Sequence, residues 1–449
     1  MLRFLCGYAL GTVALILPIA SLHSPPAAAG GDLRAVWEEY GRLEGQRGPD
    51  HYRTWLERFD RAVANDPQAD PLALYFVRRE QGHLCQWLKA WEDAVRHADD
   101  AARLAPSPVE RFLTEYDAAF AARELLPDRA AMQSPAGERL LARYAALREQ
   151  VERPDGLAAR GELKKDEVVL TSYLAVLSNH ALLIKERGAL EQACAVYDNA
   201  LRLVNDGRLP TDAGVHILNN RAALLTERGA HREALELYER SLRLLRESPP
   251  FDSMFGDRET MQATPLYGAM ICAAHCKDKA RSERYLLELV RSKVCARRPA
   301  VAALYVLDLA RAEDPVGGAA YQARLKWWVD RVGPSHPSWA RSMLFLARSL
   351  GAQEETLPEE ARLLEQLLSA YANSPPPEGV EWRSIRWECW ARLAELYGTP
   401  GTRLSNLPRA RELARRYLEE TREQCTEGVQ QHRMRLALLL RELEAPAPR

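Results

Sequence analysis

The feature that most constrains this chain is an internal repeat, in which residues 177–203 align without a gap with residues 218–244. Of the 27 aligned positions, 13 are identical. The offset of the two copies, about 41 positions, is typical of arrays in which each unit buries its apolar face only against its neighbours. The length of 449 residues would also suit about three compact domains. The self-match favours the array for at least the central part of the chain.

Apolar residues recur every three or four positions along nearly the whole chain, as amphipathic helices require. Alternating strand patterns are nearly absent, and the best of them, Val168-Val169-Leu170, leads directly into a helical pattern. Short segments rich in proline and glycine interrupt the helical pattern at residues 153–156, 248–250, 314–318 and 374–377. The sequence therefore predicts an all-α protein with short connections.

Small and aromatic residues occupy equivalent positions in the two repeat copies. These pairs are Ala181 and Ala222, Gly188 and Gly229, Ala193 and Ala234, and Tyr197 and Tyr238. The alanines allow two helices to approach closely, the glycines fall in the turn between them, and the tyrosines fill the contact with the next hairpin. The pattern resembles the tetratricopeptide repeat. The period and the Leu-Asn-Asn-x-Ala stretch at 218–222 are most similar to kinesin-light-chain-like bacterial repeats, as is the Gly-Pro-x-His-Pro stretch at 333–337.

The resemblance implies an α-solenoid, in which helix-turn-helix hairpins stack into a right-handed superhelix with a concave inner surface. About ten hairpins are expected from the length. Weaker repeats follow the spacing of Gly82, Ala94 and Ala98 near the N-terminus, and of Trp390 and Ala394 near the C-terminus. The predicted regions are a signal segment at 1–29, divergent hairpins at 30–160, the best-defined repeat pair at 161–250, divergent hairpins at 251–330 and repeat-like hairpins at 331–449.

Residues 1–29 have the pattern of a secretory signal peptide. Arg3 precedes an apolar run from residue 4 to residue 22, and Ala27-Ala28-Ala29 fits a cleavage site. The alternative is an uncleaved anchor, because an apolar run of this length barely spans a bilayer. We expect an exported protein, periplasmic or secreted, that contacts a membrane only if this segment is retained.

The charge balance argues against a nucleic-acid partner. The chain carries 61 basic and 62 acidic residues, a formal net charge of −1, so it lacks the basic excess of a nucleic-acid binder. Arginine supplies 53 of the basic residues and lysine only 8. Pairs at repeated helical positions, such as Arg187 and Arg228, are typical of a solvated helix surface with ion pairs.

The resemblance also indicates where a partner would bind. In a tetratricopeptide hairpin the first helix lines the concave side, and in the resembled family an asparagine at the positions of Asn179 and Asn220 tends to hydrogen-bond the backbone of an extended peptide. The groove candidates for a protein or peptide partner are Asn179, Lys185, Asn219, Asn220, Arg348 and Arg392. The alternative is that these asparagines bond neighbouring helices across the stack. The family often has leucine where this chain has His180 and Arg221, so the local packing is expected to differ.

No common catalytic or cofactor motif occurs in the sequence, and we expect a non-enzymatic scaffold without cofactor or metal. Cys272 and Cys276 share a helix face, but such spacing is more often packing than a metal site. His336 lies at a helix start before Pro337, where a structural role is expected. Trp382 and Trp387 are secondary ligand candidates in a tryptophan-rich region. The alternative function is an α-helical hydrolase of envelope polymers, which would need two carboxyl groups in one cavity.

Overall fold

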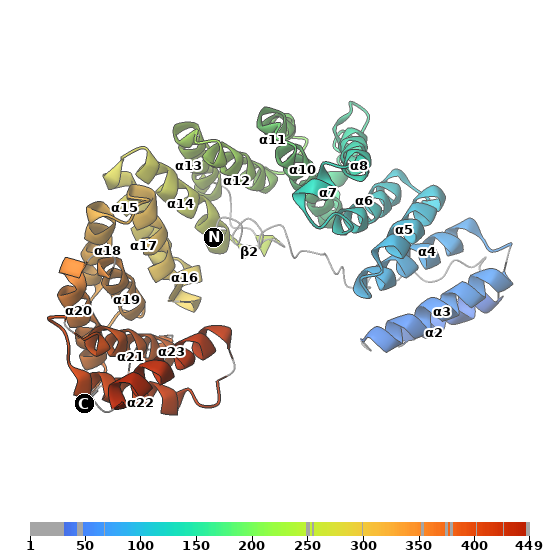
Figure 1. Ribbon diagram of the computed structural model, residues 1–449. Coiled ribbons are helices and arrows are strands. Elements are labelled where there is room, and N and C mark those ends of the chain that lie inside the picture. The colour runs from blue at the N-terminus through green and yellow to red at the C-terminus, as the bar shows by residue number, and fades with distance from the viewer. Residues whose placement is uncertain are drawn as a thin grey trace. The chain divides into compact units, whose positions relative to one another are not determined.

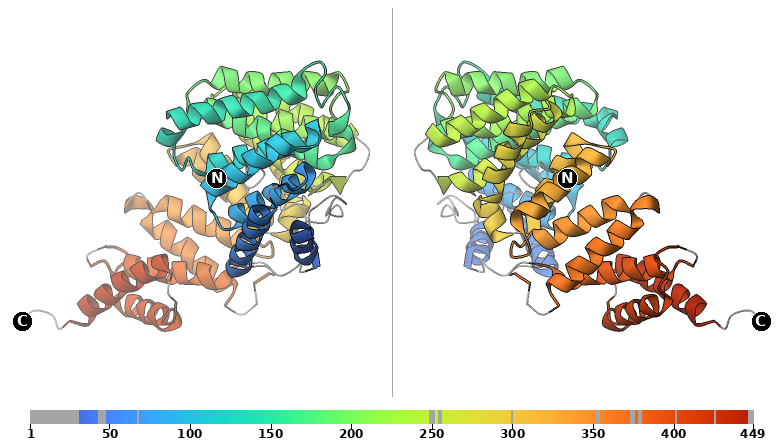
Figure 2. Two further views of the ribbon diagram at one scale, coloured as in Figure 1. Left: turned by 90° about the vertical axis from the view of Figure 1, so that its right-hand side faces the viewer. Right: turned by 90° about the vertical axis from the view of Figure 1, so that its left-hand side faces the viewer.

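The computed structural model describes residues 31–445, except residues 43–47, 67, 248–251, 254–255, 299, 352–353, 373–375, 378–379, 401 and 425. The chain divides into two compact units between Phe255 and Gly256. Within each unit, consecutive helices pack side by side as hairpins (Figure 1 and Figure 2). The predicted signal segment at 1–29 lies outside the described residues.

The first unit is built from hairpins, each with a first helix, called helix A, and a second, called helix B. They are α2 (Gly31–Arg42) with α3 (Pro49–Asn65), α4 (Pro71–Trp87) with α5 (Trp91–Leu104), α6 (Pro108–Glu124) with α8 (Pro135–Glu152), α10 (Glu167–Glu186) with α11 (Leu190–Asn205), and α12 (Thr211–Glu227) with α13 (His231–Glu247). The short helices α7 (Arg129–Met132) and α9 (Glu162–Lys165) lie in connections. Helices A of neighbouring hairpins contact one another.

The second unit repeats this arrangement. Its hairpins are α14 (Arg258–His275) with α15 (Lys279–Val290), α17 (Ala300–Glu313) with α18 (Ala319–Val332), α19 (Trp339–Leu350) with α20 (Leu357–Ala370), and α21 (Trp382–Gly398) with α22 (Leu407–Glu420). The remaining elements of this unit are α16 (Lys293–Arg297), the 3₁₀ helix η2 (Glu354–Thr356), α23 (Glu427–Glu444) and the strand β2 (Gly256–Asp257), while the strand β1 (Asp252–Ser253) belongs to the first unit. The prediction of an all-α protein of stacked helical hairpins is confirmed, while the handedness of the superhelix stays a prediction.

The two best-matched repeats form the hairpins α10–α11 and α12–α13. Ala181 and Ala222 are buried between helices, as are Ala193 and Ala234 on the facing helices B. Without larger side chains at these positions, the two helices of a hairpin can approach closely. Gly188 and Gly229 follow helix A with φ angles of 85° and 82°, a backbone conformation that glycine adopts readily. The two copies of the internal repeat therefore share these residues because both hairpins pack in the same way.

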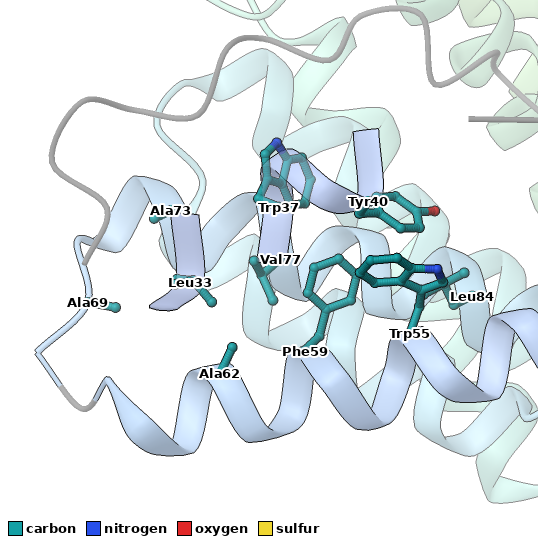
Figure 3. Close-up of a cluster of buried hydrophobic side chains, with 10 residues drawn as sticks. All are labelled: Leu33, Trp37, Tyr40, Trp55, Phe59, Ala62, Ala69, Ala73, Val77 and Leu84. Carbon is teal, nitrogen blue, oxygen red and sulfur yellow. The ribbon is translucent and has the colours of Figure 1, made fainter. Parts of the chain in front are cut away.

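Aromatic side chains build the core of the first hairpins. Trp37 and Tyr40 of α2 pack on Trp55 and Phe59 of α3, with ring centroids of Tyr40 and Trp55 5.0 Å apart (Figure 3). Edge and tilted contacts of this kind add to the free energy gained from burying the rings. This core holds α2, α3 and α4 together where the repeat pattern in the sequence is weak.

Helix α10 is long and apolar enough to cross a membrane by length and composition, and it is the one such helix among the described residues. Its most apolar window is 72% buried inside the protein. A helix A between two neighbouring hairpins is covered on several sides, which accounts for its apolar character. Burial of this extent identifies α10 as a core helix of the stack.

His336 organises the start of α19. Its Nδ1 accepts a hydrogen bond from the backbone nitrogen of Ser338 at 3.1 Å and lies 2.8 Å from the Ser338 hydroxyl oxygen. That hydroxyl in turn accepts a hydrogen bond from Nε1 of Trp328 at 3.0 Å. Burial lowers the pKa of His336, which favours the neutral ring that this acceptor role needs. The Gly-Pro-x-His-Pro stretch thus fixes a helix start against α18.

Candidate functional site

All six groove candidates lie on helices A. Asn179 and Lys185 belong to α10, Asn219 and Asn220 to α12, Arg348 to α19 and Arg392 to α21. The first four share the first unit, and the two arginines share the second unit. We call the side of the stack formed by neighbouring helices A the helix-A face. The six residues differ in what their polar atoms contact.

Asn219 carries a hydrogen-bonding atom that the described part of the chain leaves unused. Its side chain is 7% exposed, and its Oδ1 has no hydrogen-bond partner among the described residues. A buried acceptor without a partner costs about 1–3 kcal/mol. The Asn219 oxygen is therefore an unsatisfied acceptor within the described part of the chain.

The other two asparagines face neighbouring helices. Nδ2 of Asn220 on α12 donates to Oγ of Ser178 on α10 at 3.1 Å, and that hydroxyl donates to the carbonyl oxygen of Leu174 at 2.9 Å. Asn179 lies beside the buried Tyr144 of α8, whose hydroxyl donates to the carbonyl oxygen of Ala119 at 3.4 Å. The Asn220 amide thus makes the contact across the stack that the sequence left open as the alternative to peptide binding.

The charged candidates Lys185 and Arg348 form ion pairs between neighbouring helices A. Nζ of Lys185 lies 3.1 Å from a carboxylate oxygen of Glu227, which joins α10 to α12. Arg348 of α19 lies 2.5 Å from a carboxylate oxygen of Glu388 on α21. Arg348 is the more exposed of the two, with half of its side chain open to solvent.

Arg392 is held inside the second unit. Its guanidinium donates two hydrogen bonds of 2.8 Å to Glu360 on α20, and only 1% of the Glu360 side chain is exposed. A Cβ atom at Gly351 would lie 2.6 Å from a carboxylate oxygen of this pair, so the glycine leaves room for it. The bidentate geometry suits arginine and carboxylate. The predicted partner-binding residue Arg392 is therefore occupied by a contact within the chain.

Further polar contacts between helices A were not predicted from the sequence. His83 of α4 lies 3.2 Å from Asp117 of α6, and the Tyr267 hydroxyl of α14 donates to Asp308 of α17 at 3.0 Å. The partners are 34 and 41 residues apart, close to one repeat length. Polar residues that recur at the repeat spacing on helix A are the sequence signal that would have found them.

His83 lies between two carboxylates. Its Nε2 is 3.2 Å from Asp117 and its Nδ1 is 3.5 Å from Glu80, which also accepts a hydrogen bond from Tyr40. Hydrogen bonds to Asp117 and Glu80 outweigh the opposing effect of burial and raise the pKa of His83 to about 9. A ring that is protonated at neutral pH cannot act as a general base there. The protonated His83 ring lies between the carboxylates of Glu80 and Asp117 and compensates the negative charge of both.

His180 and Arg221, where the resembled family often has leucine, make polar contacts to helix B. His180 lies 3.4 Å from the guanidinium of Arg148 on α8, and Arg148 forms a bidentate pair with Glu152. Arg221 on α12 lies 2.7 Å from the carboxylate of Asp198 on α11. Burial, followed by the nearby Arg148, lowers the pKa of His180 to about 4. Polar pairing replaces apolar packing at this position of both repeats.

The aromatic and cysteine candidates are mostly engaged in packing. Trp382 contacts Tyr371 edge-on at 4.8 Å, and Nε1 of Trp387 donates to Glu420 at 3.1 Å. Cys272 is buried, while Cys276 is exposed at the end of α14. Within the described residues, no group of three or more histidine, cysteine or acidic side chains is placed to hold a metal ion. Cys425 lies outside the described residues.

Comparison with known proteins identifies the repeat. A family model described as tetratricopeptide repeat matches residues 172–247, which contain most of α10 and all of α11, α12 and α13. This segment is therefore a tetratricopeptide-repeat segment, and domains of this kind are generally protein-binding scaffolds. The kinesin-light-chain-like subtype stays a prediction. No curated protein matches the chain.

Solved structures resemble the chain distantly. The apo form of the quorum sensor NprR from B. thuringiensis is 12% identical, with a TM-score of 0.37, covering 76% of this chain and 86% of NprR. The yeast Tom70 is 11% identical, with a TM-score of 0.28, covering 92% of this chain and 95% of Tom70. At TM-scores this low, neither likeness supports an argument about this chain's function.

Proposed function

We propose that this protein is an exported, non-enzymatic scaffold that binds an extended segment of a protein partner on the helix-A face of α10 and α12. The tetratricopeptide-repeat segment supports the protein-binding part of this proposal, because it covers both helices. The pattern of residues 1–29 supports export. The similarity to kinesin-light-chain-like repeats supports an extended peptide as the bound segment.

One observation carries the choice of site. Oδ1 of Asn219 is buried and has no partner among the described residues, although the neighbouring amide of Asn220 is used within the stack. An extended peptide presents a backbone N–H at every residue except proline, and such a donor would satisfy this acceptor once the Asn219 side chain rotates towards the peptide. Binding would then remove a cost that the free protein bears. A polar group kept at a cost to stability is a common sign of function.

The test uses full-length protein and a partner identified by affinity capture and mass spectrometry. The affinity of that partner, or of its bound segment as a peptide, is measured by titration calorimetry for the wild type, Asn219→Ala and Asn220→Ala. We expect Asn219→Ala to weaken binding about five-fold or more, the loss of one hydrogen bond. We expect Asn220→Ala to lower stability instead. Equal affinities of the wild type and Asn219→Ala would contradict the site.

Export is tested separately. Mass spectrometry of the N-terminus of protein from the extracytoplasmic fraction distinguishes the cleaved form, which would begin at Gly30, from a retained anchor. Recovery of the whole protein from the cytoplasm with Met1 in place would contradict export. It would leave the binding site on α10 and α12 unaffected, because that site does not involve residues 1–29.

A further inference from the structure

The connection between α15 and α17 includes the short helix α16 (Figure 1). This connection carries a concentration of positively charged side chains. Arg291, Arg297 and Arg298 are exposed here, as is Lys293. We call these four residues the basic segment. We propose that the basic segment is a second interaction surface, which binds an acidic segment of a protein.

The charge in this region is not balanced locally. Between Lys277 and Arg298 the chain has eight basic and three acidic residues, although the whole protein has a net charge of −1. Two of the three acids are already paired: Asp278 with Arg281 at 3.2 Å, and Glu283 with the buried Arg324 at 2.8 Å. The excess positive charge therefore falls at the downstream end, where the basic segment lies.

The three arginines also differ from many others in this protein. Arginines elsewhere pair repeatedly with acids of neighbouring helices, as Arg341 and Arg348 do with Glu388. Arg291, Arg297 and Arg298 form no ion pair with another described residue. The charges of these three arginines are therefore open to an acidic partner.

The scaffold beneath these charges is fixed. Cys295 of α16 is 4% exposed, and the hydroxyl of Ser292 at its start donates to the carbonyl oxygen of Leu289 at 2.6 Å. The helix packs on α14, α15 and α17. Because the backbone is already ordered, a partner would have to immobilise only the arginine side chains.

The composition of the segment favours carboxylates of a protein over a lipid surface or a nucleic acid. Three of its four cations are arginines, whose planar guanidinium matches a carboxylate with two parallel hydrogen bonds. No large apolar side chain described between residues 277 and 298 is exposed for insertion into a bilayer. Four cations would neutralise only a few phosphates of a nucleic acid, so affinity from this source alone would be weak.

The experiment measures binding of fluorescein-labelled octaglutamate to the full-length protein by fluorescence anisotropy at low salt. The test variant is R291E/R297E/R298E. The matched control is R383E/R403E/R422E, which reverses three other exposed arginines of the same unit that form no ion pair with a described residue. A second test variant, R291Q/R297Q/R298Q, is used if the first loses helicity by circular dichroism.

We expect the test variant to bind octaglutamate at least about tenfold more weakly than the wild type, and the control variant less than about threefold more weakly. Equal losses in the test and control variants would overturn the proposal, because the attraction would then be general to the surface. Stronger binding of the wild type to phosphatidylserine vesicles or to single-stranded DNA than to octaglutamate would overturn it as well, in favour of those ligands.

Discussion

Two pairs of neighbouring helices A in this protein are joined in different ways. Between α10 and α12 a neutral hydrogen bond from the Asn220 amide to the Ser178 hydroxyl accompanies the ion pair of Lys185 with Glu227. Between α19 and α21 the contact is charged, because Arg341 and Arg348 both reach the carboxylate of Glu388. Between α10 and α12 the buried Oδ1 of Asn219 has no hydrogen-bond partner among the described residues, and between α19 and α21 the charged side chains of Arg341, Arg348 and Glu388 pair with one another.

The difference explains why the family pattern is strong in one region and weak in the other. Small residues and amides at α10 and α12 keep the close packing and short polar contacts that define the repeat. At α19 to α21, ion pairs and aromatic contacts such as Trp339 with Tyr371 hold the helices, so other residue types occupy the same positions. The ion pairs of the α19–α21 junction suit it to stability, and the unsatisfied acceptor of the α10–α12 junction suits it to binding.

The largest effect is expected in the charged region. Arg392→Met would leave the Glu360 carboxylate buried without its main partner, at a cost of about 3 kcal/mol in the stability of the second unit. Urea unfolding, followed by tryptophan fluorescence, measures it. The double variant Arg392→Met with Glu360→Gln should recover at least half of the loss. A loss below about 1 kcal/mol for the single variant would show that the pair is unimportant.

A smaller, pH-dependent effect is expected at the charged junction of α4 and α6. The folded-state pKa of His83, about 9, lies above its ordinary value of 6.5. The ion pairs therefore contribute fully below about pH 6.5 and are lost as the pH rises through 9, at a cost of about 2 kcal/mol. Guanidinium unfolding of the wild type and His83→Gln at pH 6.5 and pH 9.5 measures this. A wild type that loses no more stability than His83→Gln over this range would contradict the account.

Gly351 lies against the buried pair of Glu360 and Arg392. In Gly351→Ala the new Cβ would lie 2.6 Å from Glu360 Oε2 and 2.9 Å from the Arg392 guanidinium, so the buried pair must shift. We expect a loss of about 1–2 kcal/mol in the second unit. In a double-mutant cycle with Arg392→Met, the two losses should not add, because both act on the same pair. Strict additivity would indicate that the methyl group strains the backbone instead.

The smallest stability change is expected at the hydrogen bond between Asn220 and Ser178. Asn220→Ala removes the hydrogen bond to Ser178 and should cost about 1 kcal/mol. Asn219→Ala removes an acceptor that has no described partner, so thermal unfolding should be unchanged or occur at a slightly higher temperature. Differential scanning calorimetry of the two variants side by side measures the difference. Equal destabilisation by both would show that the two amides serve the same structural purpose.

The sequence was sufficient to predict the hairpins of residues 172–247 and the repeat family to which they belong. Ala181, Gly188 and their counterparts one repeat later have steric reasons to recur, so the pattern is readable without a structure. The position of the six candidates on helices A could also be predicted, because helical spacing fixes which residues share a face. Weak repeats at α14 to α18 gave no such pattern, and their bounds came only from the structure.

The contacts of the candidates could not be predicted. Lys185 pairs with Glu227 and Arg392 with Glu360, each across a long stretch of sequence, and such pairs depend on how two helices are offset. Asn220 makes a contact across the stack, and the sequence does not show that the neighbouring Asn219, which aligns with Ser178, lacks a partner. The basic segment was also missed, because its significance depends on the acids elsewhere being already paired.

We propose that Oδ1 of Asn219 accepts a hydrogen bond from the bound partner. The most direct measurement is the affinity of the captured partner segment for the wild type and for Asn219→Ala, with thermal stability measured on the same samples. We expect the affinity of Asn219→Ala for the partner segment to be lower by about five-fold or more, while its thermal stability is unchanged or higher. Unchanged affinity, or a weakened affinity that accompanies an equal loss of stability, would contradict it.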